Sequence, residues 1–254
     1  MAPNFTVCVA VDARTIQQLE QVFPTWMRFR PGLRDRPWVA ICDTTAHKLD
    51  WWQGRLGKLK LPNLSRIGWC WGQHLKQRER MLTGFVAVPP LTAQTPYWLK
   101  IDTDVVATSD SPWPRPEWFD GEPAIISNAW GYTKPADWPQ RLDRWAADIA
   151  ELKDGPPLDL PPPAPGQETI GHRRMVSWCA FFRTDFTKLC ARLMGQRLPV
   201  PSEDTFHWYI AQRLGETLCP INMQKHGWAT RHSEKGRKKL IEEVMGIMPK
   251  GCCG

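Results

Sequence analysis

Short apolar, β-branched segments alternate with segments of helical periodicity, and this alternation restricts the fold of the chain more than any other feature. Residues 5–11 (FTVCVAV) are typical of a buried strand, and residues 15–29 carry apolar side chains at helical spacing. The same order recurs, with further strands predicted at 38–42, 65–69, 97–101, 124–127, 176–183 and 217–223. Helices are predicted at 47–56, 73–84, 186–194 and from Ser202 to Gly215. Because the strands are too far apart for hairpins, we predict an α/β fold: one mostly parallel sheet flanked by helices.

The 254 residues are enough to bury a sizeable core. We predict a single domain over 1–234, with a first half at about 1–108 and a second half at about 109–234. The Pro-rich stretch 155–167 (GPPLDLPPPAPGQ) is predicted to be a loop within the second half. Residues 235–254 are predicted to form a basic helix and a tail.

Charge and composition exclude some classes of protein. Lys and Arg number 33 against 26 Asp and Glu, a net charge of +7 that is compatible with nucleic acid, a nucleotide or a phospholipid as partner. No apolar segment reaches the roughly 18 residues of a spanning helix, and the first residues (MAPNFTVCVAVDA) do not match a secretory signal. The eight cysteines form no CxxC pair and are expected to be buried thiols. We therefore expect a cytoplasmic protein without a transmembrane segment.

Four aspartates come directly after predicted strands, where parallel sheets bind their ligands: Asp12, Asp43, Asp102 and Asp104. In extended backbone alternate side chains share a face, so Asp102 and Asp104 are able to converge on one hard cation such as Mn²⁺ or Mg²⁺. The alternative is an ordinary strand-end turn without a metal.

Three further positions have both a functional and a structural interpretation. Asp204 opens a predicted helix, where it either complements the helix dipole or acts as a general base on an acceptor hydroxyl. His226 follows the last predicted strand and is a candidate metal ligand, because Mn²⁺ accepts imidazole beside carboxylates. His232 is the competing candidate, and an ordinary surface or core histidine is the alternative for both.

The order of these motifs resembles that of the GT-A fold glycosyltransferases. The resemblance rests on an Arg-containing helix (QRERML, 77–82), a strand that ends in DxD (102–104), a strand of VSWCAFFR type (176–183) and the Glu203-Asp204 pair that opens a helix. Together these motifs span Phe5–His232, nearly the whole chain.

The resemblance implies a Rossmann-type sheet with the nucleotide-binding half at 1–108 and the acceptor half at 109–234. It implies that Val11 and Asp43 border the base and ribose of a nucleotide sugar and that Arg78 lies near the donor phosphates. Asp102 and Asp104 would hold the donor ribose and the metal, and His226 would complete the metal shell. Asp204 would be the catalytic base of an inverting enzyme.

The predicted function is therefore metal-dependent transfer of a sugar from a nucleotide-diphosphate donor to a hydroxyl acceptor, without a nucleic-acid partner. A nucleotidyltransferase is the first alternative, but it would be favoured by a Gly-rich loop after the first strand, and residues 12–15 (DART) contain no glycine. A non-catalytic nucleic-acid-binding domain is the second, supported by the net charge of +7 and the 15 tryptophans. The basic residues are, however, distributed along the chain.

Overall fold

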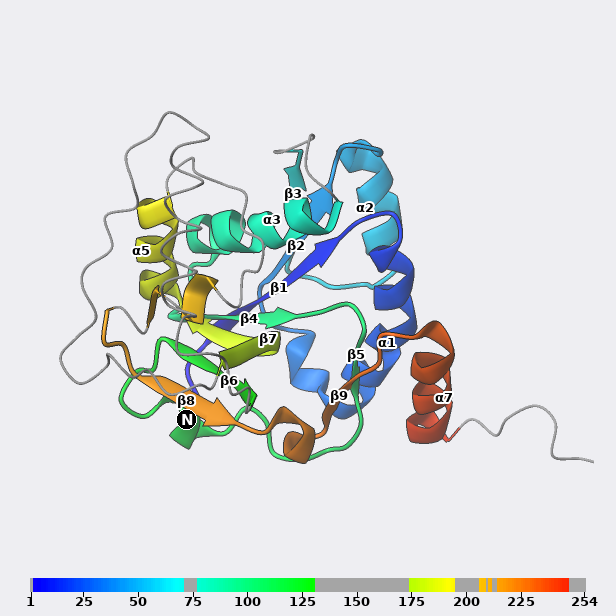
Figure 1. The fold of residues 1–254 in the computed structure, drawn as a ribbon. Helices are drawn as coiled ribbons and strands as arrows, with labels where there is room; N and C mark the ends of the chain where they lie inside the picture. Colours follow the sequence, from blue (N-terminus) through cyan, green and yellow to red (C-terminus); the bar gives the residue numbers. More distant parts are fainter. Residues whose placement is uncertain are drawn as a thin grey trace, which may run out of the picture.

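The computed structural model describes residues 2–70, 77–130, 174–194, 206–208, 210–211 and 214–246, and these residues surround one seven-stranded sheet (Figure 1). Its strand order is β3-β2-β1-β4-β7-β6-β8. The strands are β1 (Phe5–Val11), β2 (Trp38–Asp43), β3 (Leu64–Trp69), β4 (Tyr97–Ile101), β6 (Ile125–Trp130), β7 (Arg174–Arg183) and β8 (Leu218–Ile221). Only β7 runs antiparallel to its neighbours, β4 and β6. The predicted α/β fold with a mostly parallel sheet is confirmed.

Helices cover both faces of this sheet, because its central strands are apolar on both sides. In β1, Val7 and Val9 pack on the side of α1 (Thr15–Phe29), whereas Cys8 packs with α3 (Gln77–Thr92) and α5 (Thr184–Met194). The remaining helices are α2 (Leu49–Gly57), α7 (Glu234–Met245) and the short 3-10 turns η1 (Pro31–Leu33), η2 (Pro116–Phe119) and η3 (Met223–His226). A separate two-stranded ribbon pairs β5 (Val105–Ala107) with β9 (Trp228–Thr230) in antiparallel orientation. The sequence patterns did not predict this ribbon.

The helix expected to stop at Gly84 continues to Thr92, so the predicted end was wrong. A Cβ at Gly84 would lie 3.0 Å from Ile41 Cγ2 and 3.5 Å from the ring of Trp69. The glycine therefore permits close packing of α3 against β2 and β3, and it does not terminate the helix.

Several tryptophans connect the core to the backbone of neighbouring elements. The Trp26 indole N–H donates to the Val105 carbonyl at 2.8 Å, and the Trp52 N–H donates to the Asp43 carbonyl at 3.0 Å. Both side chains are fully buried. Large apolar rings with one polar atom thus hold the start of β5, next to Asp104, and the end of β2 at Asp43.

Parts of the predicted organisation fall outside the described residues, including the Pro-rich loop 155–167 and the Glu203-Asp204 pair. In the C-terminal region, α7 begins after Ser233, whose hydroxyl accepts the Gly236 N–H at 3.1 Å. Among the helices in the described ranges, none combines the length and apolar character needed to cross a lipid bilayer.

The buried side chain of Arg30 connects the end of α1 to the segments that follow β5 and precede β9. The guanidinium of Arg30, which is 5% exposed, donates to the carbonyls of Phe29, Ser109 and His226, each at 2.6 Å. It also lies 5.3 Å from the centroid of the Trp228 ring. The hydrogen bond to the His226 carbonyl requires close approach at Gly227, whose φ is +73°.

We expect Gly227→Ala to lower the free energy of unfolding by about 3 kcal/mol, through left-handed strain and overpacking together. A Cβ at this position would lie 2.5 Å from Ser109 Oγ and 2.8 Å from Arg30 Nη2. Gly246→Ala is the matched control, because Gly246 has φ +67° but nothing within 4 Å of an added Cβ. Its cost should be about 1 kcal/mol. Equal losses for both variants in urea denaturation would contradict this account.

Candidate functional site

The turn after β4 carries Asp102 and Asp104. The Asp102 N–H donates to the Trp178 carbonyl at 2.8 Å, and the Asp102 carbonyl accepts from the Val105 N–H at 3.1 Å. The first bond continues the pairing of β4 with β7 by one residue, and the second closes a turn from Asp102 to Val105. Both aspartates therefore lie on a turn whose backbone is held at each end.

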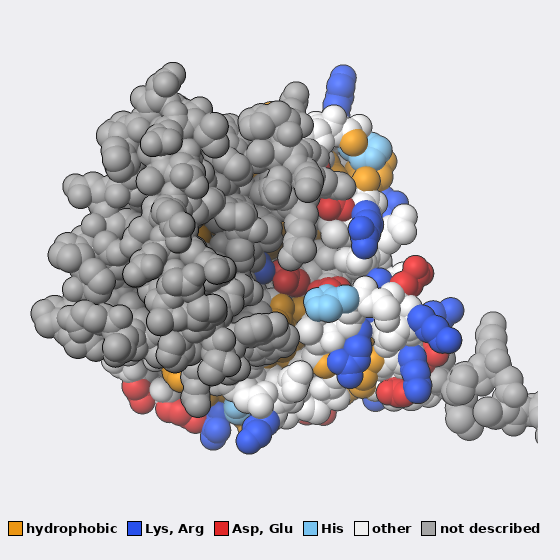
Figure 2. All heavy atoms as spheres, viewed as in Figure 1, with side chains coloured by type: hydrophobic (Ala, Val, Ile, Leu, Met, Phe, Trp, Pro, Cys, Tyr) orange, Lys and Arg blue, Asp and Glu red, His pale blue; other side chains and the backbone are white. Residues whose placement is uncertain are grey.

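Asp104 lies beside a histidine from the far end of the chain. His232 Nδ1 is 2.8 Å from Asp104 Oδ2. The ribbon causes this contact, because Val105 pairs with Thr230 and so brings the residue before β5 close to the residues after β9. The Asp104 side chain is 16% exposed and that of His232 is 85% exposed, so the pair opens to solvent. Figure 2 shows a histidine lying against acidic side chains near the middle of the viewed face.

Asp102 is paired with a lysine from inside the sheet. Lys100 Nζ lies 2.6 Å from Asp102 Oδ1, and the two residues are separated by one position of extended backbone, so their side chains share a face. The Lys100 side chain is 2% exposed, whereas that of Asp102 is 36% exposed. Asp102 therefore connects a buried cation to the surface of the molecule.

His226 has a different environment from His232. It ends η3, and its ring packs edge-on against Trp118 of η2 with 4.7 Å between the ring centroids. Partial burial, followed by the charges of Arg115 and Arg30, lowers the pKa of His226 below its usual value. This environment therefore favours the neutral form of the His226 imidazole.

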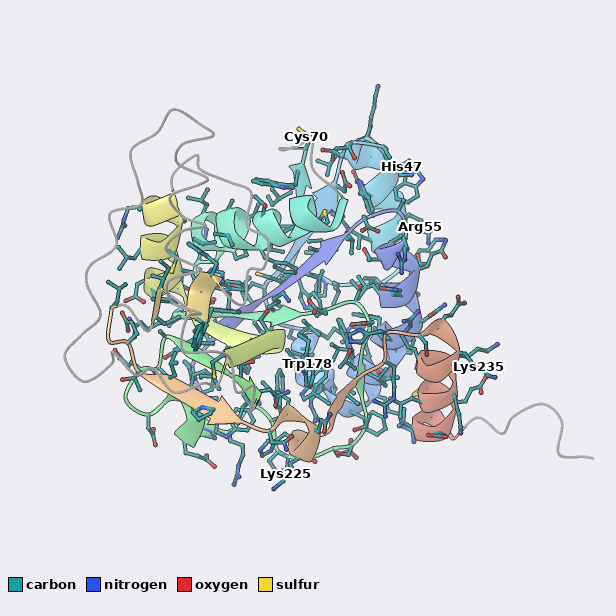
Figure 3. All side chains as sticks on the ribbon, viewed as in Figure 1. His47, Arg55, Cys70, Trp178, Lys225 and Lys235 are labelled. Atoms are coloured by element: carbon teal, nitrogen blue, oxygen red, sulfur yellow. The ribbon has the colours of Figure 1, made fainter. Side chains whose placement is uncertain are left out.

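Of the two candidate histidines, both of which the structure describes, it is His232 that contacts Asp104. Lys225, which precedes His226, points away from the molecule at the lower edge of Figure 3. The sequence-based prediction preferred His226 because this residue comes soon after the last predicted strand. The ribbon of β5 and β9, which positions His232, was not among the predicted elements.

The residues expected at the nucleoside lie at the ends of β1 and β2. The Val11 side chain is fully buried in the core. Asp43 is 4% exposed, and its Oδ1 accepts from the Thr45 N–H at 3.0 Å and from the Thr45 hydroxyl at 2.6 Å. Arg78 lies in α3, and its side chain is not among those that the structure describes. Asp43 therefore shapes the β2–α2 loop at the sheet edge.

Asp12 closes the start of α1. Its Oδ1 accepts from the N–H groups of Arg14 at 2.8 Å and Thr15 at 2.7 Å, and its own N–H donates to the Thr15 hydroxyl at 2.8 Å. A helix N-terminus often binds phosphate through such N–H groups. Here a carboxylate of the chain itself accepts from two of them, which disfavours a phosphate cradle after β1.

Asp104 and His232 fit a divalent cation that prefers oxygen ligands and accepts an imidazole, as Mn²⁺ does. In the described parts of the chain, no group of three or more His, Cys, Asp or Glu side chains is arranged to hold a metal ion. A cation bound by two protein ligands keeps coordination positions for water and for substrate oxygens. Asp204, the predicted base, lies outside the described residues.

A cavity of about 750 Å³ lies elsewhere, around the first residue of β4 and the last residue of β7. Polar side chains at its wall are already engaged: Arg183 forms ion pairs with Asp185 and Glu216, and the Thr184 hydroxyl donates to the Thr95 carbonyl. The cavity therefore lies at the opposite end of β4 from Asp102 and Asp104, and it is not part of the candidate site.

Lys100 is the residue at this site that sequence reasoning missed. A signal for it exists, because a single charged residue interrupts the apolar strand YWLKI (97–101). Lysine is almost never fully buried unless it is paired, so a lysine inside a buried strand predicts an anionic partner nearby.

Comparison with known proteins identifies the fold but not a close relative. Neither a family model nor a curated protein matches the chain. Among solved structures, the galactosyltransferase LgtC, in complex with donor and acceptor sugar analogs, matches with a TM-score of 0.52 and 8% identity, over 97% of this chain and 98% of LgtC. The chain has the GT-A fold.

Two further structures are similar. One is 4-diphosphocytidyl-2C-methyl-D-erythritol synthase from Anaerococcus prevotii, with a TM-score of 0.50 and 11% identity over 95% of this chain and 99% of the synthase. The other is core-mannan synthase A from Aspergillus fumigatus in its Mn/GDP form, with a TM-score of 0.49 and 12% identity over 84% of this chain and 70% of that protein. The similarity to LgtC, at very low sequence identity, confirms the predicted fold class.

We expect Asp12→Ala to lower the free energy of unfolding by about 1 kcal/mol, because α1 loses the carboxylate that accepts from its first N–H groups. Asp12→Asn keeps an oxygen at the accepting position and should lose much less. Thermal or urea unfolding measures both variants. Equal destabilisation by Ala and Asn would show that the hydrogen bonds of Oδ1 do not contribute to the free energy of unfolding.

Proposed function

We propose that this chain transfers a sugar from a nucleotide-diphosphate sugar to a hydroxyl acceptor and needs Mn²⁺ or Mg²⁺ to do so. The observation that carries this proposal is the position of Asp102, Asp104 and His232 at the carboxyl end of the central strand of a GT-A fold. In parallel α/β sheets this edge is where ligands bind.

Asp104 and His232 are the proposed metal ligands, and His232 replaces His226 because it contacts the Asp104 carboxylate. The cation would offset the negative charge that develops on the leaving diphosphate, a term of several kcal/mol in related chemistry. Asp102 is proposed to accept a hydrogen bond from the donor ribose.

The nucleoside would lie over the ends of β1 and β2. Asp43 is the proposed acceptor for the base or ribose, and its position is supported by the two hydrogen bonds from Thr45 that fix its carboxylate. Because Val11 is buried, its proposed contribution is limited to its backbone at the end of β1. Arg78 is proposed to approach the donor phosphates from α3.

A nucleotidyltransferase is the second candidate, favoured by the similarity to the erythritol synthase. The hydrogen bonds of Asp12 at the start of α1 disfavour it, because this carboxylate accepts from N–H groups that a phosphate loop would offer. The two reactions release different products. Sugar transfer releases a nucleoside diphosphate, whereas nucleotidyl transfer from a nucleoside triphosphate releases pyrophosphate.

The experiment that tests the main proposal is a thermal-shift panel of nucleoside diphosphates with and without Mn²⁺. A ligand that binds only the native state raises the melting temperature. We expect at least one nucleoside diphosphate to stabilise the protein in the presence of Mn²⁺ and to do so much less without it. Stabilisation by none of them would contradict the proposal.

We expect His232→Ala to weaken Mn²⁺ binding by more than about tenfold, since loss of even a hydrogen-bonding partner of a metal ligand costs about 10- to 100-fold. His226→Ala is the matched control and should leave Mn²⁺ affinity unchanged. Titration of the Mn²⁺ EPR signal measures both variants. The reverse pattern would restore His226 as the ligand and reject His232.

We also propose that Asp204 is the general base and that the reaction inverts the anomeric centre. Asp204→Asn should lower kcat by about 10² or more and leave donor binding unchanged, because an amide cannot take the acceptor proton. Glu203→Gln is the control, since adjacent helical side chains point about 100° apart. Small and equal effects of the two variants would show that Asp204 acts only on the helix dipole.

A further inference from the structure

Lys100 occupies an unusual position for a charged residue. It is the last but one residue of β4, the residue as a whole is 1% exposed, and its Nζ lies 4.9 Å from the centroid of the Phe85 ring. Burial of an ammonium group is costly unless the cation is paired and hydrogen-bonded. The contacts of the Lys100 ammonium group therefore show which groups offset the cost of burying it.

The contacts of Lys100 Nζ lead to the site and to the neighbouring strand. Nζ donates to Asp102 Oδ1 at 2.6 Å, to the Ser177 carbonyl at 3.0 Å and to the Ser177 hydroxyl at 3.2 Å. An ammonium group has three N–H donors, and these oxygens are all suitable acceptors for them. Because Ser177 belongs to β7 and is 3% exposed, the lysine is fixed from inside the sheet.

We propose that Lys100 is a positioning residue that gives the two aspartates different roles. Through its ion pair it orients the Asp102 carboxylate for the ribose of the donor and offsets its charge. The negative charge of the turn that Lys100 does not offset then resides on Asp104, which binds the cation together with His232. This inference rests on the function proposed above and extends it to a residue that does not itself touch the substrate.

The inference predicts opposite changes in two affinities when the ammonium is removed. Without Lys100, Asp102 loses a cation at contact distance, so the turn attracts a bare metal ion more strongly. The same change removes the contact of Lys100 that helps to orient Asp102 and leaves the site one positive charge poorer opposite the diphosphate, so the nucleotide binds more weakly. A variant that had merely lost its structure would instead bind both the metal ion and the nucleotide more weakly.

The experiment compares Lys100→Met with Lys188→Met in the full chain. Both variants remove one positive charge, but Lys188 is exposed on α5 and lines the cavity at the opposite end of β4. Mn²⁺ affinity is measured from its EPR signal, nucleoside-diphosphate affinity by calorimetry at saturating Mn²⁺, and folding by circular dichroism.

For Lys100→Met we expect Mn²⁺ alone to bind about tenfold more tightly, the change expected for about 1.4 kcal/mol. The nucleoside diphosphate should bind at least several-fold more weakly, and Lys188→Met should alter neither affinity. Weakening of both affinities, or a change in neither, would overturn the proposed role of Lys100.

Ser177→Ala covers the case in which Lys100→Met does not fold. It keeps the ammonium but removes one of its hydrogen bonds, so Mn²⁺ affinity should be unchanged and nucleotide affinity should fall at least twofold. Unchanged nucleotide affinity would reject the positioning role. If the wild-type protein binds no nucleoside diphosphate with Mn²⁺, the proposed function fails, whereas wild-type binding with the wrong response of these variants rejects only the role of Lys100.

Discussion

The candidate site depends on one strand that is paired along both edges. β4 pairs with β1 in parallel and with β7 in antiparallel orientation, and the β7 pairing continues to the Asp102 N–H. A strand hydrogen-bonded on both sides has little freedom to shift its register, because one step would turn its side chains to the opposite faces. The turn from Asp102 to Val105 is consequently presented at a defined point of the sheet edge.

The ribbon of β5 and β9 supplies the second part of the site. It has only three residues in each strand, and short isolated hairpins are marginally stable in water. Its stability comes from packing: Trp26 donates to the Val105 carbonyl, and Trp228 is fully buried beside the Arg30 guanidinium. The contact of Asp104 with His232 therefore depends on core residues far from the site in sequence.

Electrostatics at the sheet edge are more balanced than the acidic motif suggests. Asp102 is paired with Lys100, and Asp104 lies beside an imidazole that is 85% exposed. An edge with two unpaired carboxylates would repel a diphosphate until a cation arrived. Internal pairing of one carboxylate reduces that repulsion, and this is consistent with a site for a cation and an anion together.

The sequence by itself determined the alternation of strands and helices and the placement of Asp12, Asp43, Asp102 and Asp104 after strands, because periodicity and strand length are local properties. It also led to the GT-A fold, through the order of several individually weak motifs. It did not determine the end of α3, the ribbon, the contact of His232 with Asp104, or the pairing of Asp102 with Lys100. These depend on contacts between distant residues: Gly84 with Ile41, Val105 with Thr230 and Lys100 with Ser177. Only the tertiary structure decides such contacts, because the free energy of burying and pairing a side chain is set by neighbours that the local pattern does not contain.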